Sequence, residues 1–389
     1  MGQLAYSHFK SQNFIAYTPI NILRIFSGAA RNRNSSGRNG FVPAIDRYPD
    51  RKRPDILTDR QYTARTLQAM ALNKNEYILL PIAAVLTVRN HIRNRQSGKQ
   101  TFLGHYSSSP LFFQSISRMN DIEDIILSHS LRGIDTVKHA LPEGYCRRAA
   151  EMIIANPGTV LIGTGFPVGD SFETDGPIGA IGLYRVLEQL DYHPLFVCAP
   201  PISRILTLTF ATYEIPILDW EASFSVAEST LGETGPSVIV SVERPGVSRD
   251  GRYYNMRRQD ITDRVAKFDI FFRLSTCPTL AFGDGGNEIG MGNLIEALAH
   301  LPIIPSVTTC DELVISTVSN WGVYGVIAAM SRILHRDLFN LFDAESILDY
   351  LVANGSVDGL TTRSGYSEDG FPITVGLSII DRLRNGFTP

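Results

Sequence analysis

The sequence predicts an α/β fold, a three-layer sandwich with a mainly parallel sheet, over residues 118–389. Three observations predict it. Short apolar runs recur along this part of the chain, a glycine-rich or polar motif closes each run, and segments with helical periodicity separate them. This alternation is typical of a parallel sheet that helices cover on both faces.

Five apolar runs are the expected strands, and they are residues 159–164, 194–199, 237–242, 279–282 and 312–316. Helical periodicity extends over residues 121–155, and another helix is expected over residues 178–190. In open α/β sheets the ligand crevice lies beyond the carboxyl ends of the strands. The polar motifs that follow the runs are therefore the candidate site.

Residues 1–117 are expected to form an irregular and partly helical N-terminal extension. Its first 45 residues contain Arg and Lys but no Asp or Glu, residues 28–55 have the composition of a linker, and residues 58–94 show helical periodicity. An acidic-poor, Arg-bearing start suits either a flexible basic arm or a mitochondrial transit segment. We therefore expect a cytoplasmic protein, with the mitochondrial matrix as the alternative.

The composition excludes several classes of protein. A net charge of −3 gives no electrostatic reason to expect nucleic acid as a partner. The four cysteines are widely separated and form no CxxC pair, which argues against a structural zinc site and a disulfide framework. The best apolar run, residues 77–88, is too short to span a bilayer. A homo-oligomer is left open.

The first polar motif, residues 163–180 (GTGFPVGDSFETDGPIGA), carries Glu173 and Asp175 just before the expected helix. Both carboxylates are candidate metal ligands, and the alternative is that they cap the helix N-terminus. The Gly163-x-Gly165 spacing does not continue as a dinucleotide-binding motif, because Val168 occupies the position of the third glycine.

The second motif, residues 241–257 (SVERPGVSRDGRYYNMR), begins with Glu243 at a strand end. Its Arg, Tyr and Asn side chains suit the binding of a carboxylate, because guanidinium is a rigid bidentate donor. The candidate substrate-binding residues here are Arg244, Tyr254, Asn255 and Arg257. The alternative is a hairpin around residues 250–251 with exposed polar side chains.

The third motif, residues 282–293 (FGDGGNEIGMGN), supplies Asp284, Asn287 and Glu288 on a glycine-rich loop. Such hard oxygen ligands favour Mg²⁺ or Mn²⁺, and no His or Cys occurs in the motifs to favour zinc. The fourth motif, residues 316–325, places Asn320 at another strand end as a candidate pocket residue. One crevice would thus collect several carboxylates, and a bound cation would offset their mutual repulsion.

These motifs together resemble the D-glutamate cyclase family, meaning the C-terminal cyclase domain and its stand-alone microbial relatives. The resemblance runs through GTGFP and ETDGPIGA, VSVERPG and DGRYYNMR, GDGGNEIGMG, VSNWGVYG and VDGLT, and it covers residues 118–385. It departs from the family pattern at Arg258, where relatives often have glycine. The resemblance implies a lyase that converts D-glutamate into 5-oxo-D-proline with loss of water.

A mechanism that is consistent with these residues assigns them hypothetical roles. The expected metal ligands are Glu173, Asp175, Glu243 and Asp284, with Mg²⁺ or Mn²⁺ as the ion. The expected catalytic residues are Glu243 as general base, Asp284 and Glu288. Substrate binding is expected from Arg244, Tyr254, Asn255, Arg257, Asn287 and Asn320. Two alternatives remain open: a Mg²⁺- or Mn²⁺-dependent phosphatase or other hydrolase, and a non-catalytic sensor of an acidic metabolite.

Overall fold

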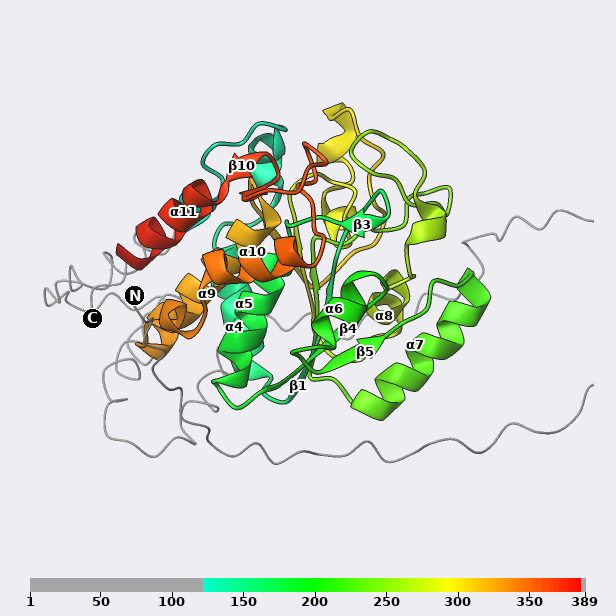
Figure 1. The fold of residues 1–389 in the computed structure, drawn as a ribbon, viewed down its shortest axis with the longest axis horizontal. Helices are drawn as coiled ribbons and strands as arrows, with labels where there is room; N and C mark the ends of the chain where they lie inside the picture. The colour runs from blue at the N-terminus through cyan, green and yellow to red at the C-terminus, as the bar shows by residue number, and fades with distance from the viewer. Residues whose placement is uncertain (1–121, 386–389) are drawn as a thin grey trace, which may run out of the picture. The chain divides into compact units, whose positions relative to one another are not determined.

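The computed structural model describes residues 122–385, and the expected extension over residues 1–117 lies outside them. The domain boundary expected at residues 117–118 therefore stays a prediction. Six parallel strands form the central sheet in the order β5-β4-β1-β6-β7-β8 (Figure 1). The predicted α/β sandwich is confirmed, and its central sheet is parallel throughout.

Five of the six central strands match the apolar runs closely. The six strands are β1 (Thr159–Thr164), β4 (His193–Cys198), β5 (Thr212–Glu214), β6 (Val238–Val242), β7 (Thr279–Gly283) and β8 (Glu312–Ile315). Every residue of β6 and β7 is buried, as expected for strands that helices cover on both faces. Strand β5 has no apolar run to indicate it, since its sequence is TYE and it lies at the sheet edge.

Helices cover both faces of the sheet (Figure 1). On one face α9 (Ser319–Leu334) packs against both α4 (Tyr145–Ala155) and α5 (Pro177–Glu188). On the other face α7 (Trp220–Thr234) packs on α8 (Asp269–Leu274). The remaining helices are α6 (Ile202–Leu206), α10 (Ala344–Ala353), α11 (Ile373–Asn385), and the 3₁₀ helices η2 (Ile134–Ala140), η3 (Thr262–Arg264), η4 (Met291–Leu294), η5 (Ala297–His300) and η6 (Leu338–Leu341). Among residues 122–385 no helix combines the length and apolarity needed to cross a membrane.

The strand order positions the site. After β1 the chain builds β4 and β5 on one side, then returns to place β6, β7 and β8 on the other side. This reversal between β1 and β6 opens a crevice at their carboxyl ends. The register brings the ends level, because Thr164 pairs with Val242 and Val242 pairs with Phe282. Residues that follow these strands therefore become neighbours.

Two short hairpins lie outside the central sheet. Strand β2 (Pro167–Val168) pairs with β3 (Ser171–Phe172), and β9 (Ser367–Glu368) pairs with β10 (Phe371–Pro372). An isolated parallel bridge joins Glu173 to Val357. The hairpins and this bridge bring residues 167–173 and 357–372, which are far apart in the sequence, to the carboxyl edge of the sheet.

The segment with helical periodicity, residues 121–155, is not one helix. Residues 122–126 are helical, η2 and α4 follow separately, and loops join the three. Gly133 and Gly144 precede η2 and α4 with φ of 82° and 84°, a conformation that glycine adopts without strain. The first of these loops carries Arg132 to the carboxyl edge of the sheet.

Candidate metal and substrate site

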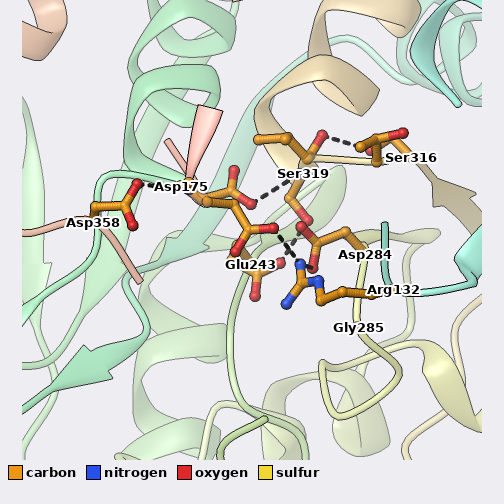
Figure 2. A network of polar contacts seen from close by, with 12 residues as sticks. Arg132, Asp175, Glu243, Asp284, Gly285, Ser316, Ser319 and Asp358 are labelled. Atoms are coloured by element: carbon orange, nitrogen blue, oxygen red, sulfur yellow. Dashed lines mark hydrogen bonds and ion pairs between the residues drawn. The ribbon is translucent and has the colours of Figure 1, made fainter. Parts of the chain in front are cut away.

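Three carboxylates from different loops meet at the carboxyl edge of the sheet (Figure 2). Asp175 precedes α5, Glu243 follows β6 directly, and Asp284 follows β7 directly. One oxygen of each lies within 4.8 Å of an oxygen of the other two, and each residue is at most 5% exposed. Three of the four expected metal ligands thus lie together, and we call them the carboxylate triad.

The Asp175 carboxylate is oriented by the N-terminus of α9. Its Oδ2 accepts the backbone N–H of Ser319 (2.9 Å), and its Oδ1 accepts those of Asn320 (2.9 Å) and Gly176 (2.7 Å). These N–H groups carry the positive end of the helix dipole, which favours a negative charge. Asp175 therefore caps α9 across the crevice, and not the helix that follows it in the sequence, α5, as the alternative interpretation expected. It also belongs to the triad.

Glu243 adopts a left-handed backbone conformation with φ of 44°, which is uncommon for a residue that has a Cβ atom. Such a conformation persists where the surrounding structure holds it. The Ser319 hydroxyl donates a 2.5 Å hydrogen bond to Glu243 Oε2. A Cβ atom on Gly176 would lie 2.6 Å from the Glu243 Cβ, so only glycine fits there. Packing and one hydroxyl thus direct this carboxylate into the triad.

Arg132 compensates part of the negative charge. Its Nη2 lies 2.5 Å from Asp284 Oδ1 and 2.7 Å from Asp369 Oδ2, and its side chain is 26% exposed. Figure 2 shows the guanidinium beside Asp284. Asp369 sits between β9 and β10, so a single arginine ties the triad to that hairpin.

Burial and like charges raise the pKa of the carboxylates. Burial raises the pKa of Glu243 well above its usual value, and the charges of Asp284 and other nearby acids raise it further. Burial also raises the pKa of Asp284 well above the ordinary range, although Arg132 opposes the shift. The pKa of Asp369 rises to about 6 for the same reason, again against the pull of Arg132. Ionising all of these groups therefore needs more positive charge than Arg132 provides.

The triad fits a hard divalent cation. Apart from the Arg132 ion pair at Oδ1, the oxygens of Asp284 accept no hydrogen bond from the described part of the chain, and Glu173 Oε1 accepts none. Buried oxygens without donors are costly unless a cation or water contacts them. Two oxygens on opposite sides of one Mg²⁺ or Ca²⁺ ion lie about 4–5 Å apart. The donor type, the burial and the spacing of the triad therefore suit a metal ion.

A cavity of about 440 Å³ adjoins the triad. Asp175 and Glu243 line it together with Glu173, Arg132, Arg257 and Arg264, whereas Asp284 is not among the lining residues. The loops that supply its walls follow β1, β6 and β7 or belong to the segment that carries Gly359 and Asp369. The cavity size is within the range of small-molecule sites.

Most of the expected site residues reach this cavity. Its lining includes Glu173, Asp175, Glu243, Asn255, Arg257, Asn287 and Glu288. Glu288 accepts the N–H groups of Gly285 (2.9 Å) and Gly286 (2.7 Å), so its carboxylate shapes the loop that carries Asp284. Asn287 donates to the Tyr254 carbonyl and fixes the neighbouring wall.

Three expected substrate-binding residues do not line the cavity. Arg244 is 2% exposed, donates to the carbonyls of Thr164 and Ala266, and lies against the Phe268 ring. The Tyr254 hydroxyl donates to Asp250 on the protein surface. The side chain of Asn320 is fully buried and accepts the backbone N–H groups of Gly176 and Gly179. Substrate contacts by these residues remain predictions.

The sequence of the described region matches a known family. Residues 122–384 match the family described as D-glutamate cyclase-like, C-terminal. The chain belongs to this family. It is similar to the human protein named D-glutamate cyclase, mitochondrial (Homo sapiens), with 30% identity over 256 residues. That alignment covers 58% of the chain and 41% of the human protein, so the chain matches less than half the length of this relative.

Three site residues of this family member were missed in the sequence interpretation. Arg132 lies in a segment whose periodicity indicated a helix, and Glu368 and Asp369 follow no apolar strand. The signal that could have indicated them is charge: Arg132 is the basic residue that precedes Gly133, and Glu368-Asp369-Gly370 is an acidic turn motif. Their role depends on contacts between distant segments, which spacing along the chain does not reveal.

Gly359 leaves the space that Glu173 occupies. A Cβ atom at this position would lie 2.0 Å from Glu173 Oε2. We expect Gly359→Ala to displace the Glu173 side chain and to lower the free energy of unfolding by about 1–3 kcal/mol, as overpacking of a buried site does. Chemical denaturation in the presence of a chelator measures this loss.

Gly232→Ala is the matched control, because a Cβ atom there meets nothing within 4 Å and the residue lies in α7. Alanine stabilises an open helical position by roughly 0.5–1 kcal/mol relative to glycine. The two Gly→Ala substitutions should therefore change stability in opposite directions. Equal stability of Gly359→Ala and the wild type would contradict the placement of Glu173.

Proposed function

We propose that the chain catalyses the cyclisation of D-glutamate to 5-oxo-D-proline with loss of water, assisted by a divalent cation. The family and the name of the human relative support the reaction class. The observation that carries the proposal is the buried carboxylate triad, two of whose members line a cavity that arginine side chains also line. A small amino acid with two carboxylates needs both kinds of charge around it.

The reaction moves two protons from nitrogen to oxygen. The substrate ammonium loses two protons, its nitrogen bonds to the γ-carboxyl carbon, and one γ-oxygen leaves with those two protons as water. No oxidant or other co-reactant is required. The protein must therefore hold the chain of the substrate in a bent conformation, accept a proton from the ammonium and return one to the departing oxygen.

Glu243 is our choice for the proton transfers. Glu243 lines the cavity. The Ser319 hydroxyl donates to its Oε2 and not to its Oε1. Burial and neighbouring acids raise its pKa well above the usual value, which makes this carboxylate a stronger proton acceptor.

Arg257 is our choice for the α-carboxylate of the substrate. Its guanidinium lines the cavity and donates through Nη2 to the Leu360 carbonyl, which anchors the side chain and leaves further N–H groups for a ligand. Arg244, the other candidate from the sequence, donates to buried carbonyls away from the cavity. A bidentate arginine contact would fix the orientation of the substrate before ring closure.

Asp175, Glu243 and Asp284 would hold the cation, with Glu173 beside them. Mg²⁺ or Mn²⁺ would supply Lewis-acid polarisation of the γ-carboxylate when bound. Arg132 would favour the charged form of Asp284, because the nearby guanidinium opposes part of the effect of burial on the pKa of that carboxyl.

The test is incubation of the full chain with D-glutamate or L-glutamate and Mn²⁺, with and without chelator, and detection of 5-oxoproline by mass spectrometry. We expect metal-dependent product from the D-isomer above the rate in buffer alone. Absence of product from both isomers would contradict the proposal. Release of phosphate from a generic phosphate ester under the same conditions would instead favour a metal-dependent hydrolase.

A further inference from the structure

Asn320 uses its side-chain amide to join three segments. Its Oδ1 accepts the backbone N–H groups of Gly176 (2.9 Å) and Gly179 (2.7 Å) at the start of α5. Its Nδ2 donates to Glu368 Oε2 (2.7 Å) and to the Thr174 carbonyl (3.3 Å). The residue is fully buried, and both ends of its amide are occupied, so it acts as a connector inside the protein.

Glu368 is a buried carboxylate that two neutral donors hold. Oε2 accepts from Asn320 Nδ2, and Oε1 accepts from Trp321 Nε1 at 2.8 Å. The residue is fully buried, and none of the ion pairs within residues 122–385 includes it. Burial raises its pKa to about 8. Burying a carboxylate costs free energy, and the two directed hydrogen bonds offset part of that cost. Such an arrangement in a folded protein indicates a role for the residue.

The connection leads to Asp175. The backbone N–H of Asn320 donates to Asp175 Oδ1, and the N–H of Gly176 is shared between Asp175 Oδ1 and Asn320 Oδ1. Asp175 and Asn320 therefore tie the N-termini of α5 and α9 to each other. A change in the orientation of Asn320 would move the first turn of α9 and, with it, two of the donors that orient the Asp175 carboxylate.

We propose that Glu368 is a positioning residue for the carboxylate triad, acting through Asn320 on Asp175. The role rests on the proposed function in one respect, namely that Asp175 is a cation ligand. Groups that orient metal ligands commonly change metal affinity when they are substituted. Glu368 acts in this way from the β9–β10 hairpin, without contact with the ion or the substrate.

The polarity of the contact gives a sharp test. Glu368→Gln presents an NH₂ group to the NH₂ group of Asn320 or to the indole N–H of Trp321, so one donor loses its acceptor. Asn320→Asp instead places a carboxylate against Glu368. The double variant Glu368→Gln with Asn320→Asp restores a donor facing an acceptor, because the Gln amide donates to the Asp carboxylate while its oxygen accepts from Trp321.

Mn²⁺ affinity of the full chain is measured by titration calorimetry. We expect each single variant to bind Mn²⁺ about 10–100-fold more weakly than the wild type, and the double variant to recover most of the loss. Asn320→Asp is decisive, because an added negative charge would tighten cation binding if only through-space attraction mattered. Tighter binding by this variant, or strictly additive losses in the double variant, would overturn the role of Glu368.

Glu123→Gln is the matched control. Glu123 is also a buried carboxylate whose oxygens accept two hydrogen bonds, from the N–H groups of Gly144 and Cys146, and it does not line the cavity. It should keep wild-type Mn²⁺ affinity. If Glu368→Gln does not fold, the double variant decides, since affinity no better than that of Asn320→Asp would overturn the proposal.

The two proposals fail in distinguishable ways. A wild-type protein that binds no Mn²⁺ removes the cation site and with it the positioning role. A wild type that binds Mn²⁺ but forms no 5-oxoproline removes the cyclase proposal alone and leaves the positioning role standing. Unchanged Mn²⁺ affinity of Glu368→Gln removes the positioning role alone.

Discussion

Glu243→Gln is expected to abolish turnover of D-glutamate and, at the same time, to stabilise the protein in chelator. The substitution keeps the size of the side chain and an oxygen that accepts the Ser319 hydroxyl, which is 2.5 Å away. It removes one negative charge from a buried site where Asp175 and Asp284 are within 4.8 Å. Function and stability should therefore change in opposite directions.

The loss of turnover has two physical causes. The Gln amide neither accepts the ammonium proton nor returns one to the departing oxygen, and positioned proton transfer contributes about 10²–10⁴-fold to rates. The cation would also lose a charged ligand. We expect the rate of 5-oxoproline formation to fall by about 10³-fold or more, measured as initial rates at saturating Mn²⁺.

The gain in stability follows from the pKa of Glu243. Burial and neighbouring acids raise its pKa in the folded protein, so a charged Glu243 weakens the folded state as pH rises above the pKa of the unfolded chain. A neutral amide avoids this cost. We expect about 1 kcal/mol of extra stability without metal, or roughly 2–4 °C in the melting temperature of a domain of this size.

Glu123→Gln serves again as the control, since that carboxylate accepts N–H groups at the start of α4 and is remote from the triad in its contacts. It should lose stability and keep turnover. Full activity in Glu243→Gln would exclude Glu243 as the proton-transfer group. A lower melting temperature in chelator would instead show that the carboxylate stabilises the cation-free fold.

The sequence was most informative where local patterns determine structure. Strand β1 spans the residues expected from its apolar run, and carboxylates follow β6 and β7 directly. The parallel fold then brings Glu243 and Asp284 together without further information, because the carboxyl ends of neighbouring strands share one edge. The fold and the core of the site could be predicted for this reason.

The sequence was least informative about the direction in which a side chain points from a correctly predicted loop. Arg244 and Asn320 occupy strand-end motifs as expected, yet both direct their polar atoms at buried backbone carbonyls or N–H groups. Arg132 and Glu368 reach the site from segments without an apolar run. Spacing along the chain gives the neighbourhood of such residues, whereas their hydrogen-bond partners depend on tertiary packing.

Arg132→Met is expected to destabilise the cation-free protein and to make it depend on Mn²⁺. The substitution retains an apolar stem and removes the charge that pairs with Asp284 at 2.5 Å and Asp369 at 2.7 Å. Breaking a buried pair by removing one partner costs about 3–5 kcal/mol. The Arg132 side chain is 26% exposed, so solvent screens part of this interaction and we expect about 2–3 kcal/mol at pH 8.

The loss should shrink at lower pH. Burial raises the pKa of Asp369 to about 6 even with Arg132 present, and it raises the pKa of Asp284 well above the ordinary range. Folded carboxyl groups with raised pKa bind protons that the unfolded chain has released, so stability falls as pH rises from about 4 through the folded pKa. Without Arg132 both values rise further. At pH 5 the acids are largely protonated, and the difference from wild type should fall to about 1 kcal/mol.

Arg148→Met separates this effect from the general loss of an ion pair. Arg148 makes two charged hydrogen bonds to Glu312, of 2.8 and 2.9 Å, with its side chain 33% exposed, and it does not line the cavity. Both variants should unfold at lower temperature in chelator. Saturating Mn²⁺ should stabilise both variants by mass action, but it should stabilise Arg132→Met more, because a cation bound to the triad also replaces the missing charge. Equal responses of the two variants to Mn²⁺ would show that Arg132 only forms an ordinary structural ion pair. A loss of stability in Arg132→Met that does not change with pH would show that the buried acids do not cause it.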